Sequence, residues 1–184
     1  MLKLNLGSGS SRIEGFTNVD MNSADDIDVQ ADVQHLPFFD STVDEIYASH
    51  ILEHLPYNSA VLSEWSRVLC PGGLCTVIVP DPIATYYAWK HECATWGKDA
   101  HPVDLQYLNA CCFGGKVLGG EWDTPGQVHQ QVFFYDMLVD RMRAQFPDAQ
   151  QVAWPVVNVQ RVDSWLCETT VQGHNGKEDW VAWS

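Results

Sequence analysis

The feature that most constrains this chain is a glycine-containing turn between two short apolar segments near the N-terminus. Leucines alternate with other residues over positions 2–6, as in a strand, and Gly7 and Gly9 follow directly. Glycine permits a sharp turn whose backbone can approach a ligand closely. A second strand ends at Asp20, whose carboxylate can accept hydrogen bonds from a ribose diol. The pattern predicts a nucleotide-type binding edge in an α/β fold.

The spacing of these residues indicates which kind of nucleotide could bind. A dinucleotide-binding motif has a third glycine, a helix facing the pyrophosphate and an acidic residue about 20 positions on. Here Arg12 takes the place of the third glycine, and Asp20 comes only thirteen positions after Gly7. A full βαβ connection needs at least about 10–12 residues, so little helix fits. We therefore disfavour an NAD-dependent oxidoreductase and expect an adenosine ligand without phosphates, typically S-adenosylmethionine (SAM).

Length and charge limit the fold and the partners. The 184 residues suit one domain, spanning 1–184, with a sizeable core. The formal net charge of −14 disfavours a nucleic-acid backbone or an anionic membrane as the main partner, since both attract basic proteins. We expect a small-molecule substrate and a monomer or homodimer. The sequence shows neither a long apolar run nor a charged leader with an apolar segment, so we expect a cytoplasmic protein.

Strand and helix patterns alternate along the rest of the chain. Asp32 closes the third predicted strand as Asp20 closes the second, and both should lie at the carboxyl edge of one sheet. The alternation predicts a mostly parallel sheet with helices on both faces and an antiparallel C-terminal hairpin. The segments after Asp20 are a strand at 27–31, a strand at 43–49, a helix at 58–69, a strand at 74–81, a helix at 133–146 and strands at 152–159 and 165–171.

One long segment, about 82–131, interrupts this alternation. It is rich in aromatic residues and contains two glycine pairs. Long insertions after the carboxyl end of a strand commonly carry a substrate site or a lid. We predict that this insertion is a substrate cap, with most of its aromatic side chains packing it onto the sheet.

Eight short motifs follow one another between Lys3 and Asp81. They are Leu4-Asn-Leu-Gly-Ser-Gly, Asn18-Val-Asp, Ala31-Asp, Leu36-Pro-Phe, Val43-Asp-Glu-Ile, Leu52-Glu-His-Leu, Glu64-Trp-Ser-Arg-Val-Leu-Cys-Pro-Gly-Gly and Val79-Pro-Asp. In this order they resemble a class I SAM-dependent methyltransferase of the type-11 kind, in the subgroup of small predicted methyltransferases with a shortened first helix. The resemblance implies a Rossmann-like methyltransferase fold.

This resemblance implies a set of SAM-binding residues. The glycine turn would approach the methionine part, and Asp20 would bind the ribose hydroxyls. Met21 would pack on the adenine, with Asp32 and the amide of Val33 at its exchangeable edge. The end of the fourth strand would line the sulfonium side. The complete implied set is Leu6, Gly7, Ser8, Gly9, Asp20, Met21, Asp32, Val33, Ser49 and His50.

Methyl transfer from SAM needs few catalytic groups from the protein. Methyl transfer from a sulfonium is an in-line displacement, so the protein mainly aligns the reactants and excludes water. We expect an oxygen or nitrogen acceptor on a small molecule, and a hydroxyl acceptor would need a general base. The candidate bases are His50, His54 and His129. A SAM-binding regulatory protein without catalysis would keep the same cofactor residues and remains an alternative.

A metal is not part of the main hypothesis. Six cysteines show no Cys-x-x-Cys pair, and we interpret them as reduced and mostly buried. An alternative is a divalent-metal-dependent O-methyltransferase, because His50, Glu53 and His54 have a spacing that can present ligands on one helical turn. This pattern resembles the Glu-x-x-Glu-His cluster of metal-dependent methyltransferases, and His129 could supply a distant further ligand.

Overall fold

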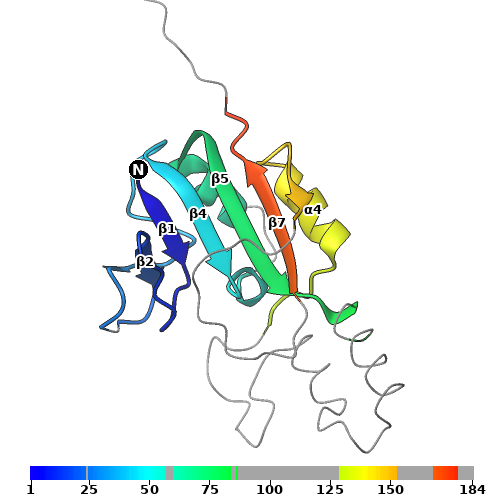
Figure 1. The fold of residues 1–184 in the computed structure, drawn as a ribbon, viewed down its shortest axis with the longest axis horizontal. Helices are drawn as coiled ribbons and strands as arrows, with labels where there is room; N and C mark the ends of the chain where they lie inside the picture. Colours follow the sequence, from blue (N-terminus) through cyan, green and yellow to red (C-terminus); the bar gives the residue numbers. More distant parts are fainter. Residues whose placement is uncertain (24, 57–59, 84–85, 87–128, 153–167, 178–184) are drawn as a thin grey trace, which may run out of the picture.

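The protein is a mixed α/β structure built on one twisted sheet (Figure 1). The computed structural model describes residues 1–23, 25–56, 60–83, 86, 129–152 and 168–177. Among these residues the sheet has seven strands in the order β3-β2-β1-β4-β5-β7-β6. The strands are β1 (Lys3–Leu6), β2 (Thr17–Asp20), β3 (Val29–Gln30), β4 (Val43–Ser49), β5 (Leu69–Pro80), β6 (Gln150–Gln151) and β7 (Glu168–His174).

Strand direction follows the sequence prediction. Strands β1 to β5 pair in parallel, and β7 runs antiparallel to both β5 and β6. This confirms a mostly parallel sheet with an antiparallel C-terminal part. Strand β6 lies just before the predicted 152–159 segment, and β7 ends three residues beyond the predicted 165–171 segment. Residues 153–167, which include most of the predicted hairpin, lie outside the described part.

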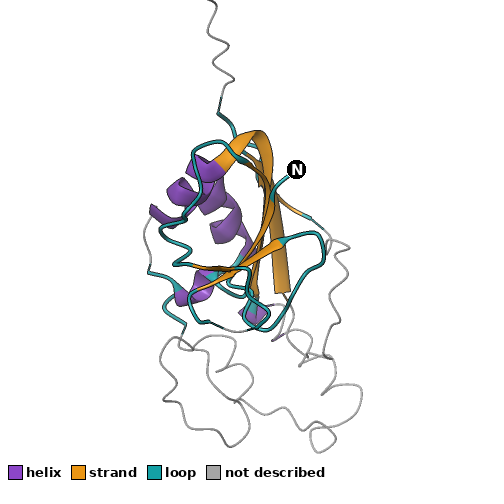
Figure 2. Cartoon of the chain, turned by 90° about the vertical axis from the view of Figure 1, so that its left-hand side faces the viewer, coloured by secondary structure: helices purple, strands orange, loops and turns teal. Residues whose placement is uncertain are grey.

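The two described α-helices lie on the same face of the sheet (Figure 2). They are α1 (Ala60–Val68) and α4 (Tyr135–Arg143). Helix α4 is shorter than the predicted helix at 133–146, and the first residues of the predicted helix at 58–69 lie outside the described part. One core cluster joins Trp65 of α1 and Met142 of α4 to strand residues such as Leu4, and all three are fully buried. On the opposite face, the described residues form a small cluster of Ile13, Tyr47 and Ile78, against which Phe16 packs.

The connection between β1 and β2 contains no helix. Residues 7–16 form turns and bends. The sequence resemblance predicts a shortened first helix, and the structure has no helix at this position. The predicted substrate cap at 82–131 is described only at its two ends, over residues 82–83, 86 and 129–131.

Asn175, which follows β7, fixes the C-terminal end of α1. Its side chain is buried, and its Nδ2 donates hydrogen bonds to the carbonyl oxygens of Ser66 and Leu69 at 3.0 and 2.8 Å. Its Oδ1 accepts a bond from the Ser66 hydroxyl at 3.1 Å. These contacts satisfy carbonyl groups that a helix end leaves without internal partners. These hydrogen bonds therefore attach the segment that follows β7 to the C-terminal end of α1.

We predict that Asn175→Ala lowers the free energy of unfolding by about 2–3 kcal/mol, because buried carbonyl groups lose their donors. Urea denaturation would measure this loss. The matched control is Gln150→Ala, at an exposed position of the edge strand β6, which should change stability by less than about 0.5 kcal/mol. Equal stability of the two variants would contradict the structural role of Asn175.

Arg67 and Glu64 of α1 fix the loop that leads into β4. The carboxylate of Glu64 accepts hydrogen bonds from the guanidinium of Arg67 and from the Leu36 amide N–H, at 2.7 Å each on Oε1. Arg67 also donates to the carbonyl oxygen of Phe38 and to Asp40. The hydrogen bond from Arg67 is the main reason that the pKa of Glu64 lies below its ordinary value of 4.5.

A depressed carboxyl pKa makes stability depend on pH in a defined direction. The Glu64 contribution is present above the unfolded pKa of about 4.5 and is lost as the pH falls through the lower folded pKa. We predict that Glu64→Gln destabilises the protein at pH 7 and that this difference shrinks progressively below pH ~4.5. Denaturant midpoints of both proteins across pH 3–7 would test this. A difference that is independent of pH would contradict it.

Candidate cofactor site

The site begins at the turn after β1. The backbone N–H groups of Gly7 and Ser8 both donate to the carbonyl oxygen of Val19 in β2, at 2.9 and 3.2 Å. This chain reversal needs positive φ angles, 64° at Gly7 and 51° at Gly9. A Cβ atom at Gly7 would lie 2.6 Å from the side chain of Ile51, whereas a Cβ at Gly9 would meet no atom within 4 Å. Gly7 is thus required for both conformation and space, and Gly9 for conformation alone.

We predict different costs for alanine at the two glycines. Gly9→Ala should lower the free energy of unfolding by about 1–2 kcal/mol, the cost of a left-handed non-glycine residue. Gly7→Ala should cost at least about 1 kcal/mol more, because the methyl group also displaces Ile51. Urea denaturation of both variants measures the difference. Equal losses would show that Ile51 does not crowd this turn.

A cavity of about 330 Å³ opens beside this turn, at the carboxyl ends of β1 and β4. It brings together five predicted cofactor residues: Gly7, Ser8, Gly9, Ser49 and His50. The Ser8 Oγ atom is buried and has no hydrogen-bond partner among the described residues. Leu6, also predicted, is fully buried in the core directly before the turn. The wall of the cavity therefore contains a residue whose buried hydroxyl has no partner among the described residues.

Other cavity residues were not predicted from the sequence. They are Asn5, Ser10, Ser11, Ile13 and Tyr47. Asn5 and Tyr47 are paired in register on neighbouring strands, so their side chains lie on the same face of the sheet. The available signal was a polar residue inside an otherwise apolar strand, at Asn5. The Tyr47 contribution depends on the pairing of β1 with β4, which the sequence alone did not specify.

Asp20 lies next to the turn but does not line the cavity. Its Oδ2 accepts a hydrogen bond from the Gly9 N–H at 2.9 Å, and its Oδ1 accepts bonds from the N–H and the side chain of Asn22. The residue is 8% exposed. In this state the carboxylate holds the glycine turn in place.

The three remaining predicted cofactor residues follow along the same edge of the sheet. Met21 is 63% exposed, and Val33 is buried with its carbonyl oxygen accepting a bond from the Trp65 indole. Partial burial of Asp32 opposes its ionisation, but hydrogen bonds from the Gln34 N–H and from His35 outweigh this and lower its pKa. Asp32 is thus an ionised acceptor at the end of the third strand.

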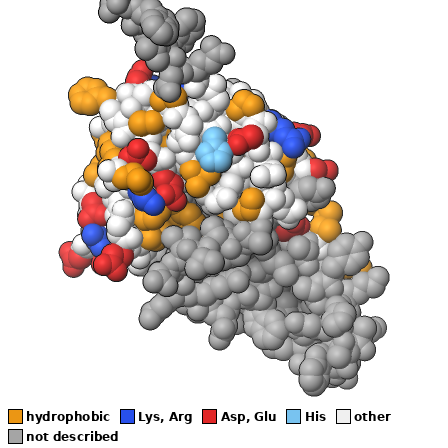
Figure 3. All heavy atoms as spheres, turned by 45° about the horizontal axis from the view of Figure 1, so that its top comes forward, with side chains coloured by type: hydrophobic (Ala, Val, Ile, Leu, Met, Phe, Trp, Pro, Cys, Tyr) orange, Lys and Arg blue, Asp and Glu red, His pale blue; other side chains and the backbone are white. Residues whose placement is uncertain are grey.

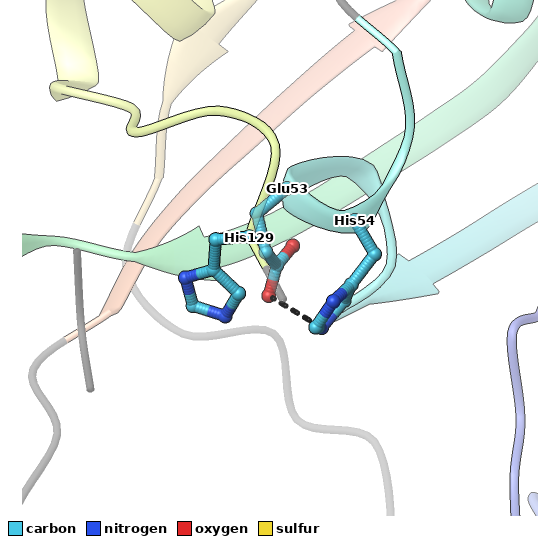
Figure 4. Close-up of side chains that lie close together, drawn as sticks. All are labelled: Glu53, His54 and His129. Carbon is cyan, nitrogen blue, oxygen red and sulfur yellow. Dashed lines mark ion pairs between the residues drawn. The ribbon is translucent and has the colours of Figure 1, made fainter. Parts of the chain in front are cut away.

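The three candidate bases gather around Glu53. His50 follows β4 with a positive φ of 55°, and its Nδ1 lies 3.4 Å from Glu53 Oε1. The short 3₁₀ helix η1 (Leu52–His54) places the Nε2 of His54 4.0 Å from the same oxygen. The ring centroids of His54 and His129 lie 4.8 Å apart, in an edge-to-face arrangement. Figure 4 shows both rings beside the Glu53 carboxylate.

The expected presentation of His50 and His54 on one helical turn is wrong. η1 begins at Leu52, and the left-handed conformation of His50 separates it from the helix. Glu53 and His54 instead approach His129, which lies far along the sequence. The physical reason is the left-handed conformation of His50 at the end of β4, which a spacing rule for regular helices cannot represent.

With the antiparallel β7 and the glycine turn after β1, the sheet that the described residues form is similar to the fold of solved SAM-dependent methyltransferases. A SAM-dependent methyltransferase from Methanosarcina mazei superposes with a TM-score of 0.58 at 15% identity, covering 96% of this chain and 92% of that chain. The 1,6-didemethyltoxoflavin-N1-methyltransferase of Burkholderia thailandensis, solved with its substrate and S-adenosylhomocysteine, gives 0.52 at 15% identity and covers 96% and 71%.

The sequence comparison points to the same class. Residues 14–77 match the family model described as a methyltransferase domain, which confirms the resemblance seen in the sequence motifs. The sterol 4-C-methyltransferase of Caenorhabditis elegans is 43% identical over 72 residues. That match covers 39% of this chain and 21% of the relative. In the described part of the chain, no helix is long and apolar enough to cross a membrane.

Proposed function

We propose that the protein is a SAM-dependent methyltransferase that transfers a methyl group to an oxygen or nitrogen atom of a small-molecule acceptor. The observation that carries the proposal is the cavity beside the glycine turn, with the unpartnered hydroxyl of Ser8 in its wall. A ligand with a polar amino-acid end fits this chemistry because it can satisfy a buried hydroxyl. The methyltransferase domain match over residues 14–77 supports the same cofactor.

The protein residues have separable roles in this proposal. The glycine turn and Ser8 bind the methionine end, and Asp20 and Asp32 accept hydrogen bonds from the adenosine. SAM supplies the activated methyl group, which an acceptor atom displaces in line with the sulfur. The chain aligns the acceptor and keeps water out. His50 lines the cavity and contacts Glu53, so it is the best placed of the three candidate bases to take a proton from a hydroxyl acceptor.

The charge of the chain supports a small-molecule acceptor. The net charge is −14, and on the face in Figure 3 the basic side chains are interspersed with acidic ones. Binding along a nucleic-acid backbone requires concentrated positive charge. A small acceptor needs only the cavity and the residues around it.

We predict that Asp20→Ala weakens SAM binding by about 2–3 kcal/mol, because two hydrogen bonds to the ribose hydroxyls are lost. This corresponds to a roughly 30- to 140-fold higher Kd in isothermal titration calorimetry. Asp140→Ala removes an exposed carboxylate on α4, away from the cavity, and should leave the Kd unchanged. Unchanged affinity in Asp20→Ala would refute the ribose assignment.

Calorimetry with SAM and, separately, with NAD tests the proposed cofactor directly. Binding of SAM and not NAD is the expected result, and failure to bind SAM would refute the proposal. Transfer of an isotopically labelled methyl group to members of a panel of small hydroxyl and amine compounds then separates an enzyme from a SAM-binding regulatory protein. An enzyme labels an acceptor, whereas a regulatory protein binds SAM without turnover.

A further inference from the structure

Three potential metal ligands converge beside the cofactor cavity (Figure 4). Glu53 and His54 come from η1, and His129 comes from the segment before α4. Their potential ligand atoms all lie within 4.8 Å of one another. Glu53 also contacts His50, which lines the cavity. The cluster thus lies at the edge of the space where we propose that methyl transfer occurs.

A set of hydrogen bonds fixes this arrangement. The backbone N–H groups of Gln130 and Gln131 both donate to the carbonyl oxygen of Glu53, at 2.7 and 3.2 Å. The Gln130 side chain donates to the carbonyl oxygen of His54 at 2.9 Å. The Gln131 side chain donates to the carbonyl oxygens of Leu52 and Leu55. Because these bonds attach residues 130–131 to η1, the preceding His129 is held beside Glu53 and His54.

The Glu53 side chain lacks the partners that a buried carboxylate needs. It is 2% exposed, and neither carboxylate oxygen makes a hydrogen bond within the described residues. The Nδ1 atom of His50 and the Nε2 atom of His54 lie 3.4 and 4.0 Å from its Oε1. The Nδ1 atom of His54 is also buried without a hydrogen-bond partner there. A buried carboxylate is costly unless it is paired or coordinates a metal.

We propose that Glu53, His54 and His129 bind one divalent transition-metal ion, for which Zn²⁺ is the natural first probe. Two imidazoles and one carboxylate are a donor set that suits Zn²⁺ and neighbouring first-row ions. With metal–ligand bonds of about 2.1 Å, the ligand atoms would lie about 3.0–3.5 Å apart. The present spacing of up to 4.8 Å would have to close by about 1.3–1.8 Å through side-chain rotation. The contact from His50 orients the carboxylate from the outer shell.

Three protein ligands leave at least one coordination position for another molecule. An oxygen or nitrogen atom of the methyl acceptor is the expected occupant, because the cluster borders the cavity through His50. A hydroxyl bound to the metal loses its proton more readily, which favours nucleophilic attack. This assignment of the acceptor's ligating group rests on the proposed function, whereas metal binding by the three side chains does not.

The test is metal binding by the full-length protein in the absence of SAM. Protein freed of metal with EDTA and then transferred to chelator-free buffer is titrated with ZnCl₂ by calorimetry, and bound zinc is counted by mass spectrometry after gel filtration. We expect one equivalent. Glu53→Gln, His54→Ala and His129→Ala should each raise the Kd at least tenfold, while His35→Ala, an exposed histidine outside the cluster, should not. Circular dichroism verifies that each variant is folded.

Cobalt provides a second readout that separates this site from the cysteines. Coordination of Co²⁺ by histidine and carboxylate gives weak visible bands, whereas thiolate ligands add an intense near-ultraviolet band. No stoichiometric binding of Zn²⁺ or Co²⁺, a thiolate spectrum, or binding that Glu53→Gln and His129→Ala leave intact would overturn the metal site. SAM titrations of the same samples separate the two proposals: SAM binding without metal binding refutes only the metal site, and the reverse result refutes only the proposed function.

Discussion

The short connection between β1 and β2 is the constraint on which the candidate cofactor site depends. Without a helix, its backbone polar groups need other partners when they are buried. Two buried asparagines supply them: Asn5 Nδ2 donates to the Ser11 carbonyl oxygen and to Asn18 Oδ1, which also accepts the Ile13 N–H. Asn18 in turn donates to the carboxylate of Asp28. The network replaces a helix and keeps the glycine turn open toward the cavity.

Asp20 illustrates how one side chain can serve both structure and binding. Its carboxylate accepts the Gly9 N–H, which fixes the turn, and it stands at the end of β2 where a ribose is expected. A carboxylate offers about four lone-pair positions, and the bonds from Gly9 and Asn22 use three of them. Binding of two ribose hydroxyls therefore requires that one bond from Asn22 is released. The position of Asp20 is therefore determined by the turn before any ligand arrives.

The region after β4 depends on an unusual backbone conformation. His50 adopts a left-handed conformation that a non-glycine residue seldom adopts, and its N–H is fixed by the carbonyl oxygen of Ile78 in β5. Such strain persists where surrounding contacts determine the conformation, and it is frequent at functional sites. Three residues further on, Glu53 is buried next to Gln130 and Gln131 from the other half of the chain.

Much of the fold could be predicted from local patterns. Strand β4 was predicted at its observed bounds, and the apolar run that ends at Pro80 identified the core of β5. The start of β5 was not predicted, because residues 70–73 have the composition of a turn. In the structure they belong to β5, and the pairing of β5 with β4 has a register shift between Val43 and Glu45. The insertion at 82–131 was predicted from composition, and both the insertion and its interpretation as a substrate cap remain predictions, because most of this segment lies outside the described residues.

Local patterns also predicted some residues of the candidate site and not others. The glycine turn, Asp20 and Asp32 were identifiable because each follows a strand, and parallel strands end at one edge of the sheet. Asn5 and Tyr47 were missed, since their place in the cavity follows from strand register. The convergence of His54 and His129 on Glu53 was not predictable in its actual geometry, because it depends on the bonds from Gln130 and Gln131 to η1.

The sequence by itself determined the class of fold, because the glycine turn, the apolar periodicity and the acids after the strands are local properties of the chain. Only the tertiary structure decided which distant side chains meet. Hydrogen bonds between residues 130–131 and η1 bring His129 to Glu53, and burial there removes the water that would otherwise solvate the carboxylate. The Glu53 carboxylate therefore needs a new partner because of its burial in the folded protein, and a local sequence pattern does not show that burial.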